Sequence, residues 1–274
     1  LPPDILAQLR SPIVALVHHP LALETGLDAE QRARFMISER AALDQAHAVV
    51  VTSPLTAATL TRDFQVKPGK LTIAEPGTEP ALRATGTGAP FTMLTVGSII
   101  PRKGYLGLIE ALATLSDPDW HLIIAGSPEH DPAEANRLRE AVLASGKRGQ
   151  ITMTGKVSNK ELADLYTRAD LFVMASLYEG YGMVLAEALA RGLPIVCTAA
   201  GAAAETAPDA AAIKVQPGDA SALGAALDTV MRDKQRRAAL ADGAWAEGQR
   251  LPRWPATASK IANVIKSTHK VRAS

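Results

Sequence analysis

Short apolar runs recur along the chain, and segments with a helical period separate them. The runs are apolar at consecutive positions rather than at alternate ones, which predicts strands that are buried on both faces. In the first third of the chain the predicted strands are 13–17, 48–51 and 70–73. Between them, residues 28–46 and 53–63 predict helices, the second with Ser53 as N-cap and Pro54 at the first helical position. Such alternation predicts a parallel sheet with crossover helices.

A stretch dense in proline and glycine, residues 75–90, interrupts this pattern and predicts a linker with a domain boundary near residue 84. Beyond it the pattern restarts. Six strands are predicted at 91–96, 120–125, 151–154, 171–174, 194–198 and 211–215, separated in part by helices at 103–115, 132–145, 159–169 and 182–191. Six strands complete a doubly wound nucleotide-binding sheet. Three more helices, at 221–230, 235–247 and 254–267, are predicted to end the chain.

The first segment offers only three strands, and a parallel sheet of that size exposes an apolar edge and face that a stable domain normally covers. Residues 1–83 therefore predict the second half of a similar domain whose first half is absent from this sequence. The first residues, Leu1-Pro2-Pro3-Asp4, show neither a signal-peptide pattern nor an initiator methionine, so we expect the start to be a cut. The expected fold class is α/β.

Composition narrows the function classes. The chain has 274 residues, 47% of them hydrophobic and 21% charged, which is typical of a globular protein. Lys and Arg number 29 against 28 Asp and Glu, and aromatic residues make up 4%, so neither a strong positive field nor many stacking platforms would hold nucleic acid. No run approaches the roughly 18 apolar residues of a membrane helix. We expect a cytoplasmic protein that does not bind nucleic acid.

Two smaller features also bear on the environment of the chain. The single cysteine, Cys197, excludes an intrachain disulfide and lies in an apolar run, which predicts a buried thiol. The last predicted helix and the residues after it carry Lys260, Lys266, Lys270 and Arg272. These basic residues have two interpretations, a solvated helical face or a contact with phosphates or a membrane surface.

The segment Glu179–Glu187 follows a predicted buried strand and opens a helix, and ligands bind such sheets at the carboxyl ends of the strands. Gly180 and Gly182 remove side chains there, so backbone N–H groups can face an anion such as a diphosphate. Two glutamates eight positions apart in a helix would lie about 12 Å apart. Their carboxylates could accept hydrogen bonds from hydroxyls at both ends of an extended ligand. The alternative is a surface glutamate and an ordinary helix glutamate.

Two further candidates follow predicted strands. Lys103, at the head of a predicted helix, can place its ammonium on a phosphate, although Arg102-Lys103 could also be an exposed basic turn. His18 and His19 follow the first strand, where a histidine is either a structural hydrogen-bonding group or a catalytic one. Successive side chains of an extended chain alternate, so only one of the two can point into a cleft. Asp117 and Asp119 have the spacing of a metal-binding pair, but they precede a strand, and we expect no metal site.

The sixteen residues from Glu179 to Pro194, EGYGMVLAEALARGLP, resemble the signature of the retaining GT-B glycosyltransferases of family 4, also called glycosyl transferase group 1. Residues 154–157 and 162–179 resemble the run that usually precedes it. The resemblance implies two Rossmann-like domains that face a cleft. Residues 1–83 would be part of the N-terminal, acceptor-side domain, residues 84–250 the domain that binds the nucleotide sugar, and residues 251–274 a helix that crosses back to the N-terminal domain.

The resemblance also implies roles for individual residues. Glu179 would contact hydroxyls of the transferred sugar, Glu187 would hold the ribose, and Lys103 would neutralise the diphosphate. Ser98 stands where the family often has an arginine, a departure for which Arg102 could compensate. His18, with His19 as the alternative, would lie near the transferred sugar. The other expected donor-binding residues flank the base, sugar or diphosphate: Lys156, Val157, Gly180, Tyr181, Gly182, Met183 and Val184.

The function implied is retaining transfer of a sugar from a nucleotide-diphosphate sugar to an acceptor hydroxyl, without a divalent metal or a cofactor. Lys103 and backbone N–H groups would stabilise the leaving diphosphate. The expected partners are the nucleotide-sugar donor and a hydroxyl acceptor, which could be a sugar, a lipid-linked sugar or a small molecule. The alternative is a protein that binds a nucleotide or nucleotide sugar without transfer. A dehydrogenase is disfavoured, because no Gly-x-Gly-x-x-Gly follows a predicted strand.

Overall fold

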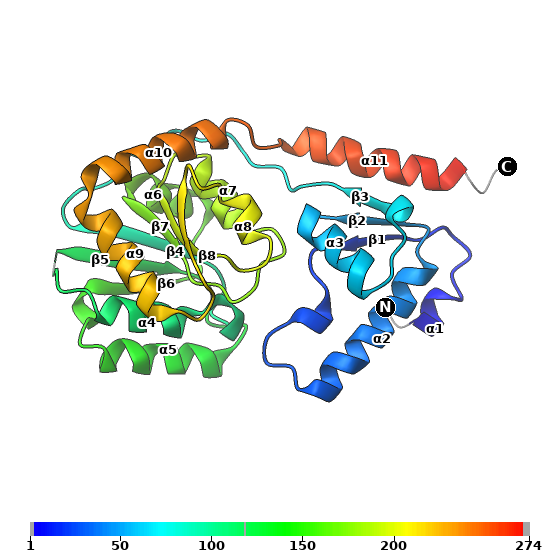
Figure 1. The fold of residues 1–274 in the computed structure, drawn as a ribbon, viewed down its shortest axis with the longest axis horizontal. Helices are drawn as coiled ribbons and strands as arrows, with labels where there is room; N and C mark the ends of the chain where they lie inside the picture. Colours follow the sequence, from blue (N-terminus) through cyan, green and yellow to red (C-terminus); the bar gives the residue numbers. More distant parts are fainter. Residues whose placement is uncertain (1–2, 118, 271–274) are drawn as a thin grey trace. The chain divides into compact units, whose positions relative to one another are not determined.

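The computed structural model describes residues 3–117 and 119–270, with the side chain of Lys270 left out, and the chain divides into two compact units (Figure 1). Unit 1 comprises the residues up to Thr78, the short segment Glu179–Tyr181 and the residues from Pro252 onward. Unit 2 comprises Glu79–Tyr178 and Gly182–Leu251. The chain thus passes from unit 2 into unit 1 twice, first for the three residues Glu179–Tyr181 and again from Pro252 onward. Arg272 lies outside the described residues.

Unit 1 contains a three-stranded parallel sheet in the order β1 (Val14–Val17), β2 (Ala48–Val51) and β3 (Leu71–Ile73). Its helices are α1 (Pro3–Leu6), α2 (Ala29–Gln45), α3 (Pro54–Asp63) and α11 (Trp254–Lys270), with 3-10 turns η1 (Leu21–Leu23) and η2 (Pro68–Lys70). The predicted N-cap of α3 is confirmed, because the Ser53 hydroxyl accepts a hydrogen bond of 3.1 Å from the backbone N–H of Thr56.

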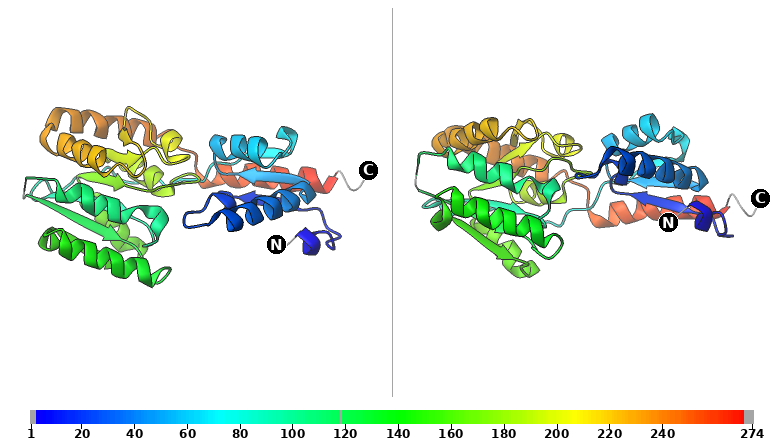
Figure 2. Two further views of the ribbon diagram at one scale, coloured as in Figure 1. Left: turned by 60° about the horizontal axis from the view of Figure 1, so that its bottom comes forward. Right: turned by 90° about the horizontal axis from the view of Figure 1, so that it is seen from below.

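Both faces of this small sheet are covered where the central strand passes. Val49 and Val51 of β2 pack with Leu43, Leu60 and Phe64 from α2, α3 and the residue after α3. Val50 faces the other way and packs with Ala74 and with Val264 of α11. The helix α11 therefore belongs to unit 1, on the side of the sheet opposite α2 and α3 (Figure 2). This alternation explains why β2 is apolar at consecutive positions.

Unit 2 contains a six-stranded parallel sheet in the order β6-β5-β4-β7-β8-β9. The strands are β4 (Phe91–Val96), β5 (Trp120–Ala125), β6 (Ile151–Gly155), β7 (Leu171–Met174), β8 (Ile195–Thr198) and β9 (Ala212–Val215). The helices are α4 (Tyr105–Ala113), α5 (Pro132–Ala144), α6 (Asn159–Arg168), α7 (Met183–Leu189), α8 (Ala203–Thr206), α9 (Ala220–Arg232) and α10 (Lys234–Gly248), with 3-10 turns η3 (Pro101–Lys103) and η4 (Arg148–Gln150). The predicted doubly wound sheet is confirmed, and its order reverses between β4 and β7.

Two buried clusters hold this sheet between its helices. One contains Met93 and Leu122 of the sheet together with Leu108, Leu138 and Leu227 of α4, α5 and α9. The other contains Phe172 and Cys197 together with Tyr166, Leu185 and Ala244 of α6, α7 and α10. Burial raises the pKa of the Cys197 thiol to about 12, so this cysteine is a packing residue, as predicted.

One sequence-based expectation needs correction, and one short helix was not predicted. Lys103 was expected at the head of a helix, but α4 begins at Tyr105, and Lys103 lies in the preceding 3-10 turn. The reason is Gly104, whose left-handed backbone (φ 65°) separates the turn from the helix. The short helix α8 was not predicted, since its alanine-rich sequence has no amphipathic period.

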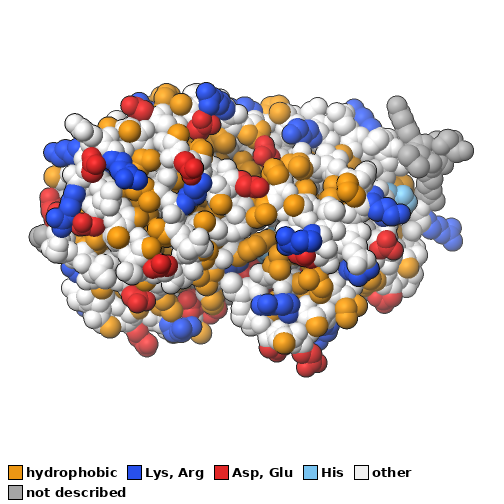
Figure 3. All heavy atoms as spheres, viewed as in Figure 1, with side chains coloured by type: hydrophobic (Ala, Val, Ile, Leu, Met, Phe, Trp, Pro, Cys, Tyr) orange, Lys and Arg blue, Asp and Glu red, His pale blue; other side chains and the backbone are white. Residues whose placement is uncertain are grey.

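The surface reflects the near-equal numbers of acidic and basic residues in the sequence. On the face drawn in Figure 3, acidic and basic side chains are interspersed among uncharged and hydrophobic ones. Within residues 3–117 and 119–270, no helix combines the length and the apolarity needed to cross a membrane.

Candidate functional site

The carboxyl ends of the first three strands of unit 2 form one continuous edge. Backbone hydrogen bonds of 3.0 Å join the loop after β4 to that after β5, from Gly97 to Ala125 and from Ile99 to Ser127. A bond of the same length joins Gly126 to Gly155 at the end of β6. A Cβ atom on Gly126 would lie 1.8 Å from the carbonyl oxygen of Gly97, so the loops touch through bare backbone. Such an edge is where nucleotides bind in doubly wound sheets.

Lys103 lies against this edge. A Cβ atom on Gly97 would be 3.1 Å from Cε of Lys103, so the lysine stem crosses the glycine of the β4 loop. The Tyr105 hydroxyl donates a hydrogen bond of 2.7 Å to the carbonyl of Gly97 and braces the same loop. Ser98, the next residue, is half-buried. The structure therefore places Lys103 against the loop that contains Gly97 and Ser98.

Arg102 has a structural task in the same turn. Its Nη1 donates a hydrogen bond of 2.8 Å to the carbonyl of Tyr178, and its own carbonyl accepts one of 2.7 Å from Leu177. Gly104 reinforces this junction, because a Cβ there would lie 2.1 Å from the carbonyl oxygen of Ala175. The turn is thus joined to the segment after β7. The sequence offered Arg102 as a compensating cation, and here it binds the backbone of that segment.

Glu187, on α7, has a defined orientation. The hydroxyl of Tyr166, a fully buried residue of α6, donates a hydrogen bond of 2.9 Å to Oε2 of Glu187. Arg191 donates one of 2.9 Å to the backbone carbonyl of Glu187, and its guanidinium lies 4.5 Å from the centroid of the Tyr166 ring. Burial, and then the charge of Glu187, raise the pKa of Tyr166 well above its ordinary value. Tyr166 is therefore a hydroxyl donor that keeps its proton beside the carboxylate.

Sequence reasoning missed Tyr166 and Arg191. Arg191 could have been found, since it stands four residues after Glu187 in the predicted helix 182–191, a spacing at which side chains meet. Tyr166 had no comparable signal, because it lies on another helix and meets Glu187 only through the packing of α6 and α7.

The two glutamates of the motif do not share a helix. Glu179 precedes α7, which begins at Met183 after Gly182 in a left-handed conformation (φ 89°). The separation of about 12 Å expected for a continuous helix therefore does not apply. Glu179 and Tyr181 are buried and belong to unit 1, whereas Glu187 belongs to unit 2. The side chain of Met183 is exposed, and the Val184 carbonyl accepts a second hydrogen bond of 3.3 Å from Tyr166.

In unit 1, the segment Glu179–Tyr181 packs on the carboxyl ends of β1 and β2. The Thr52 hydroxyl donates to the carbonyls of His18 and Gly180, at 3.2 and 3.4 Å. A Cβ atom on Gly180 would lie 2.1 Å from the carbonyl oxygen of His18, so only glycine fits. Burial, with a smaller contribution from the charge of Glu75, raises the pKa of Tyr181 to about 12.

The two histidines differ in their surroundings. His19 is held by Glu24 through a contact of 3.0 Å between Nε2 and Oε2. The side chain of His18 is exposed. The structure therefore gives His19 a structural partner and leaves the imidazole of His18 accessible, as the alternation along an extended chain requires.

The remaining predicted residues follow β6. Gly155 ends that strand in a left-handed conformation (φ 70°), after which Lys156 is exposed and Val157 packs on the second buried cluster. Asp117 accepts a hydrogen bond of 2.9 Å from the backbone N–H of Asp119 in the turn before β5. Pro118, between these two, lies outside the described residues. Within the part of the chain that the structure describes, no group of three or more His, Cys, Asp or Glu residues could hold a metal ion.

Known proteins are similar to this chain in sequence and in fold. The mannosylfructose-phosphate synthase of Agrobacterium fabrum is 29% identical over 171 residues, which are 56% of this chain and 38% of that protein. The sucrose-phosphate synthase of Thermosynechococcus elongatus superposes with a TM-score of 0.86 at 24% identity, over 98% of this chain and 70% of that one. Anabaena HepE in complex with UDP-glucose superposes with a TM-score of 0.82 at 21% identity, over 94% of this chain and 73% of that one. At these identities the structural likeness concerns the fold.

The family relationship rests on a longer match. Residues 84–245, more than half of the chain, match the family described as glycosyl transferases group 1. The matched region contains both the loop after β4 and the α7 motif. The fold is the GT-B type that the motif implied. The chain therefore belongs to the glycosyl transferases group 1.

Proposed function

We propose that this chain belongs to a retaining glycosyltransferase that transfers a sugar from a nucleotide-diphosphate sugar to an acceptor hydroxyl. The observation that carries the proposal is the carboxylate of Glu187, which a fully buried tyrosine orients on the helix that follows β7. An oriented carboxylate accepts hydrogen bonds from a vicinal diol such as that of a ribose. The family relationship supports the same assignment.

The nucleotide would lie along the carboxyl edge of unit 2. In this proposal the ribose hydroxyls donate to Glu187, and the base lies beside Lys156 and Val157 where β6 ends. The contacts of the β4, β5 and β6 loops support this path, because the loops meet through backbone rather than side chains and form one continuous edge. The related fold of HepE holds UDP-glucose, which agrees with a uridine or similar nucleotide as the carrier.

The leaving diphosphate would be stabilised by Lys103 and by backbone N–H groups of Gly182, Met183 and Val184. As the bond between the anomeric carbon and the diphosphate oxygen lengthens, negative charge grows on the diphosphate. A preorganised ammonium and fixed N–H dipoles stabilise that charge more than they stabilise the ground state. We propose on this basis a reaction without a divalent metal, in which Ser98 makes a neutral contact where the resemblance implies an arginine.

Glu179, Gly180 and Tyr181 are assigned to the transferred sugar, with His18 in a sugar-positioning role. The buried carboxylate of Glu179 and the accessible imidazole of His18 support this assignment. The acceptor hydroxyl would attack from the face that the diphosphate leaves, so the anomeric configuration is retained. The acceptor is a sugar, a lipid-linked sugar or a small molecule, and we propose a cytoplasmic location with an optional peripheral membrane contact.

The test is a panel of nucleotide-diphosphate sugars given to the full-length protein, with release of the nucleoside diphosphate and the anomeric configuration of the product as readouts. Glu179→Gln should abolish transfer while donor binding persists, and Glu187→Gln should raise the KM for the donor. Glu110→Gln, an exposed glutamate of α4, is the matched control. A product of inverted configuration would overturn the retaining assignment.

A second candidate function is nucleotide-sugar binding without transfer. Ser98 favours it, because the resemblance implies an arginine at this position and serine is neutral. This candidate predicts saturable binding of the nucleotide sugar, no release of the diphosphate with any acceptor, and no gain of transfer in Ser98→Arg.

A further inference from the structure

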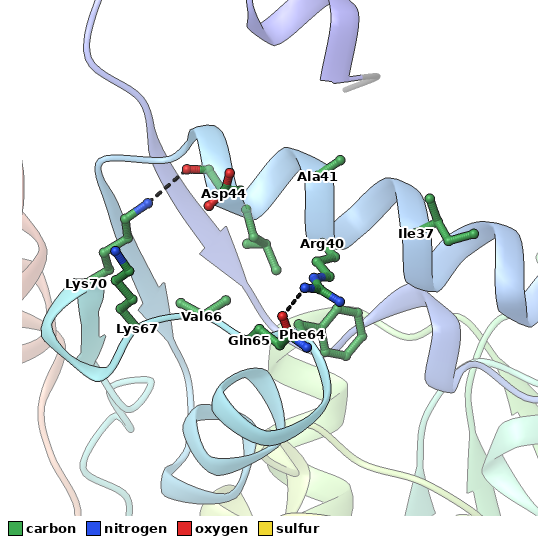
Figure 4. A pocket seen from close by; sticks show the side chains of 10 residues that line it. Ile37, Arg40, Ala41, Asp44, Phe64, Gln65, Val66, Lys67 and Lys70 are labelled. Atoms are coloured by element: carbon green, nitrogen blue, oxygen red, sulfur yellow. Dashed lines mark hydrogen bonds between the residues drawn. The ribbon is translucent and has the colours of Figure 1, made fainter.

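A hollow of about 440 Å³ opens in unit 1 between α2 and the chain that follows α3 (Figure 4). This volume lies within the range of small-molecule sites. The hollow is placed where α2 ends before β2 and where η2 leads into β3, that is, at the amino ends of the strands. His18, Thr52 and Gly180 lie at the opposite, carboxyl edge of the same sheet. The hollow is therefore separate from the residues assigned to sugar transfer.

The charged side chains of the hollow are mostly cationic. Arg40, Lys67 and Lys70 line it together with one carboxylate, that of Asp44, which leaves an excess of two positive charges. Lys70 is anchored at the end of α2 by a hydrogen bond of 2.9 Å from Nζ to the backbone carbonyl of Asp44. The side chains of Arg40 and Lys67 are exposed and accessible to an anion from solvent.

Gln65 holds the guanidinium of Arg40 in place. Its amide oxygen accepts a hydrogen bond from Nη2 of Arg40 (Figure 4). Gln65 has φ 58°, and within the described residues it is the only non-glycine residue with a positive φ. It follows the C-cap of α3, a position where glycine adopts this conformation without strain. The residue that ends α3 in a left-handed conformation therefore also contributes the side chain that orients the guanidinium of Arg40.

Below the cations, the hollow is apolar. Phe64, Val66 and Leu43 are buried and form part of the lining, and Ile37 at the rim is 71% exposed. A ligand that fits has a compact anionic group beside a less polar portion. A phosphomonoester carries about two negative charges near neutral pH, which matches the excess of two cations. The planar fork of an arginine and the point charge of a lysine suit the tetrahedral arrangement of its oxygens.

We propose that this hollow binds a phosphomonoester, with its phosphate on Arg40 and Lys67 and its remaining atoms against Ile37 and Phe64. The chemistry is shared by a soluble phosphorylated metabolite and by the headgroup of an acidic phospholipid. Lys70 adds electrostatic attraction for the phosphate, and the carboxylate of Asp44 reduces the net positive charge of the hollow.

The experiment uses two probes with the full chain. Glycerol 3-phosphate is titrated by calorimetry, and vesicles of phosphatidylcholine with or without phosphatidic acid are tested by co-sedimentation. Arg40→Gln and Lys67→Gln should each weaken binding about three- to tenfold. Arg32→Gln, an exposed arginine of the same helix outside the hollow, should leave it unchanged. Binding to glycerol 3-phosphate identifies a soluble ligand, and binding to phosphatidic acid vesicles alone identifies a lipid headgroup.

Gln65→Gly provides the sharpest test, because it leaves the charge unchanged and suits the backbone at φ 58°. We expect this variant to unfold at the same temperature as the parent or higher, and to bind the phosphate probe more weakly. Three outcomes would overturn the proposal: no binding to either probe, equal losses in Arg32→Gln and Arg40→Gln, or unchanged binding in both Arg40→Gln and Gln65→Gly. The result is independent of transfer activity, since no donor or acceptor is present.

Discussion

The hydroxyl of Tyr166 donates a hydrogen bond of 2.9 Å to Oε2 of Glu187, across 21 residues of sequence and from one helix to another. The tyrosine ring is fully buried and stacks on Phe172 with 5.7 Å between the ring centroids. The Arg191 guanidinium lies over the same ring, 4.5 Å from its centroid. This arrangement fixes the carboxylate before any ligand arrives, and preorganisation of this kind favours ligand affinity.

Replacing Tyr166 with phenylalanine should therefore impair donor binding more than folding. The ring and its packing remain, while Glu187 loses the donor that orients it. We expect the KM for the nucleotide sugar to rise about three- to tenfold, with kcat less affected. Steady-state kinetics with a varied donor measures this, and thermal unfolding provides the control. An unchanged KM in a folded variant would show that the tyrosine only fills space.

The planar guanidinium of Arg191 should stabilise the protein through its contact with the Tyr166 ring and its hydrogen bond to the Glu187 carbonyl. Arg191→Lys keeps the charge but loses both the stacking on Tyr166 and the geometry of the bond to the Glu187 carbonyl. We expect a loss of about 1 kcal/mol in the free energy of unfolding, measured by denaturant titration. Arg168→Lys, at the exposed end of α6, is the matched control and should change little. Equal effects in the two variants would contradict this role.

Two glycines of the same region should respond in opposite ways to alanine. Gly104 has φ 65°, and a Cβ there would lie 2.1 Å from the carbonyl oxygen of Ala175, so Gly104→Ala should destabilise unit 2 by more than about 3 kcal/mol. Gly107 lies within α4 with no atom within 4 Å of a new Cβ, so Gly107→Ala should stabilise by roughly 0.5–1 kcal/mol. Denaturant titrations of both variants would decide, and a tolerated alanine at position 104 would refute the close approach.

Cys197 predicts a loss of stability at alkaline pH. Its pKa rises from 9.0 to about 12 in the folded protein, so between these values the folded state binds more protons than the unfolded state. The contribution is fully present below pH 9.0 and is lost as the pH rises toward about 12. Urea titrations between neutral and alkaline pH should show a shallower decline in Cys197→Ala. Rapid reaction of the native thiol with a disulfide reagent near neutral pH would contradict its burial.

Local patterns predicted much of this structure, and the failures have a common cause. The consecutive apolar residues of β2 and β7 and the Ser53-Pro54 start of α3 depend on neighbouring residues, and the structure confirms them. The predicted start of α4 is two residues early, because Gly104 has a left-handed backbone and packs closely on the carbonyl of Ala175, which lies far along the chain. The separation of about 12 Å that a helix through both glutamates would give does not hold, because Glu179 lies before α7 and Gly180 packs on the backbone of His18.

By itself, the sequence determined the alternation of strands and helices, the six-stranded sheet and the family, since hydrophobic period and contiguous motifs are properties of neighbouring residues. Only the tertiary structure decided that Tyr166 orients Glu187, that Arg102 binds the backbone after β7, and that Gln65 holds Arg40 over a cationic hollow. Each of these pairs joins residues brought together by the order of strands and the packing of helices. A hydrogen bond acts over about 3 Å, and no pattern along the chain records which distant groups come that close.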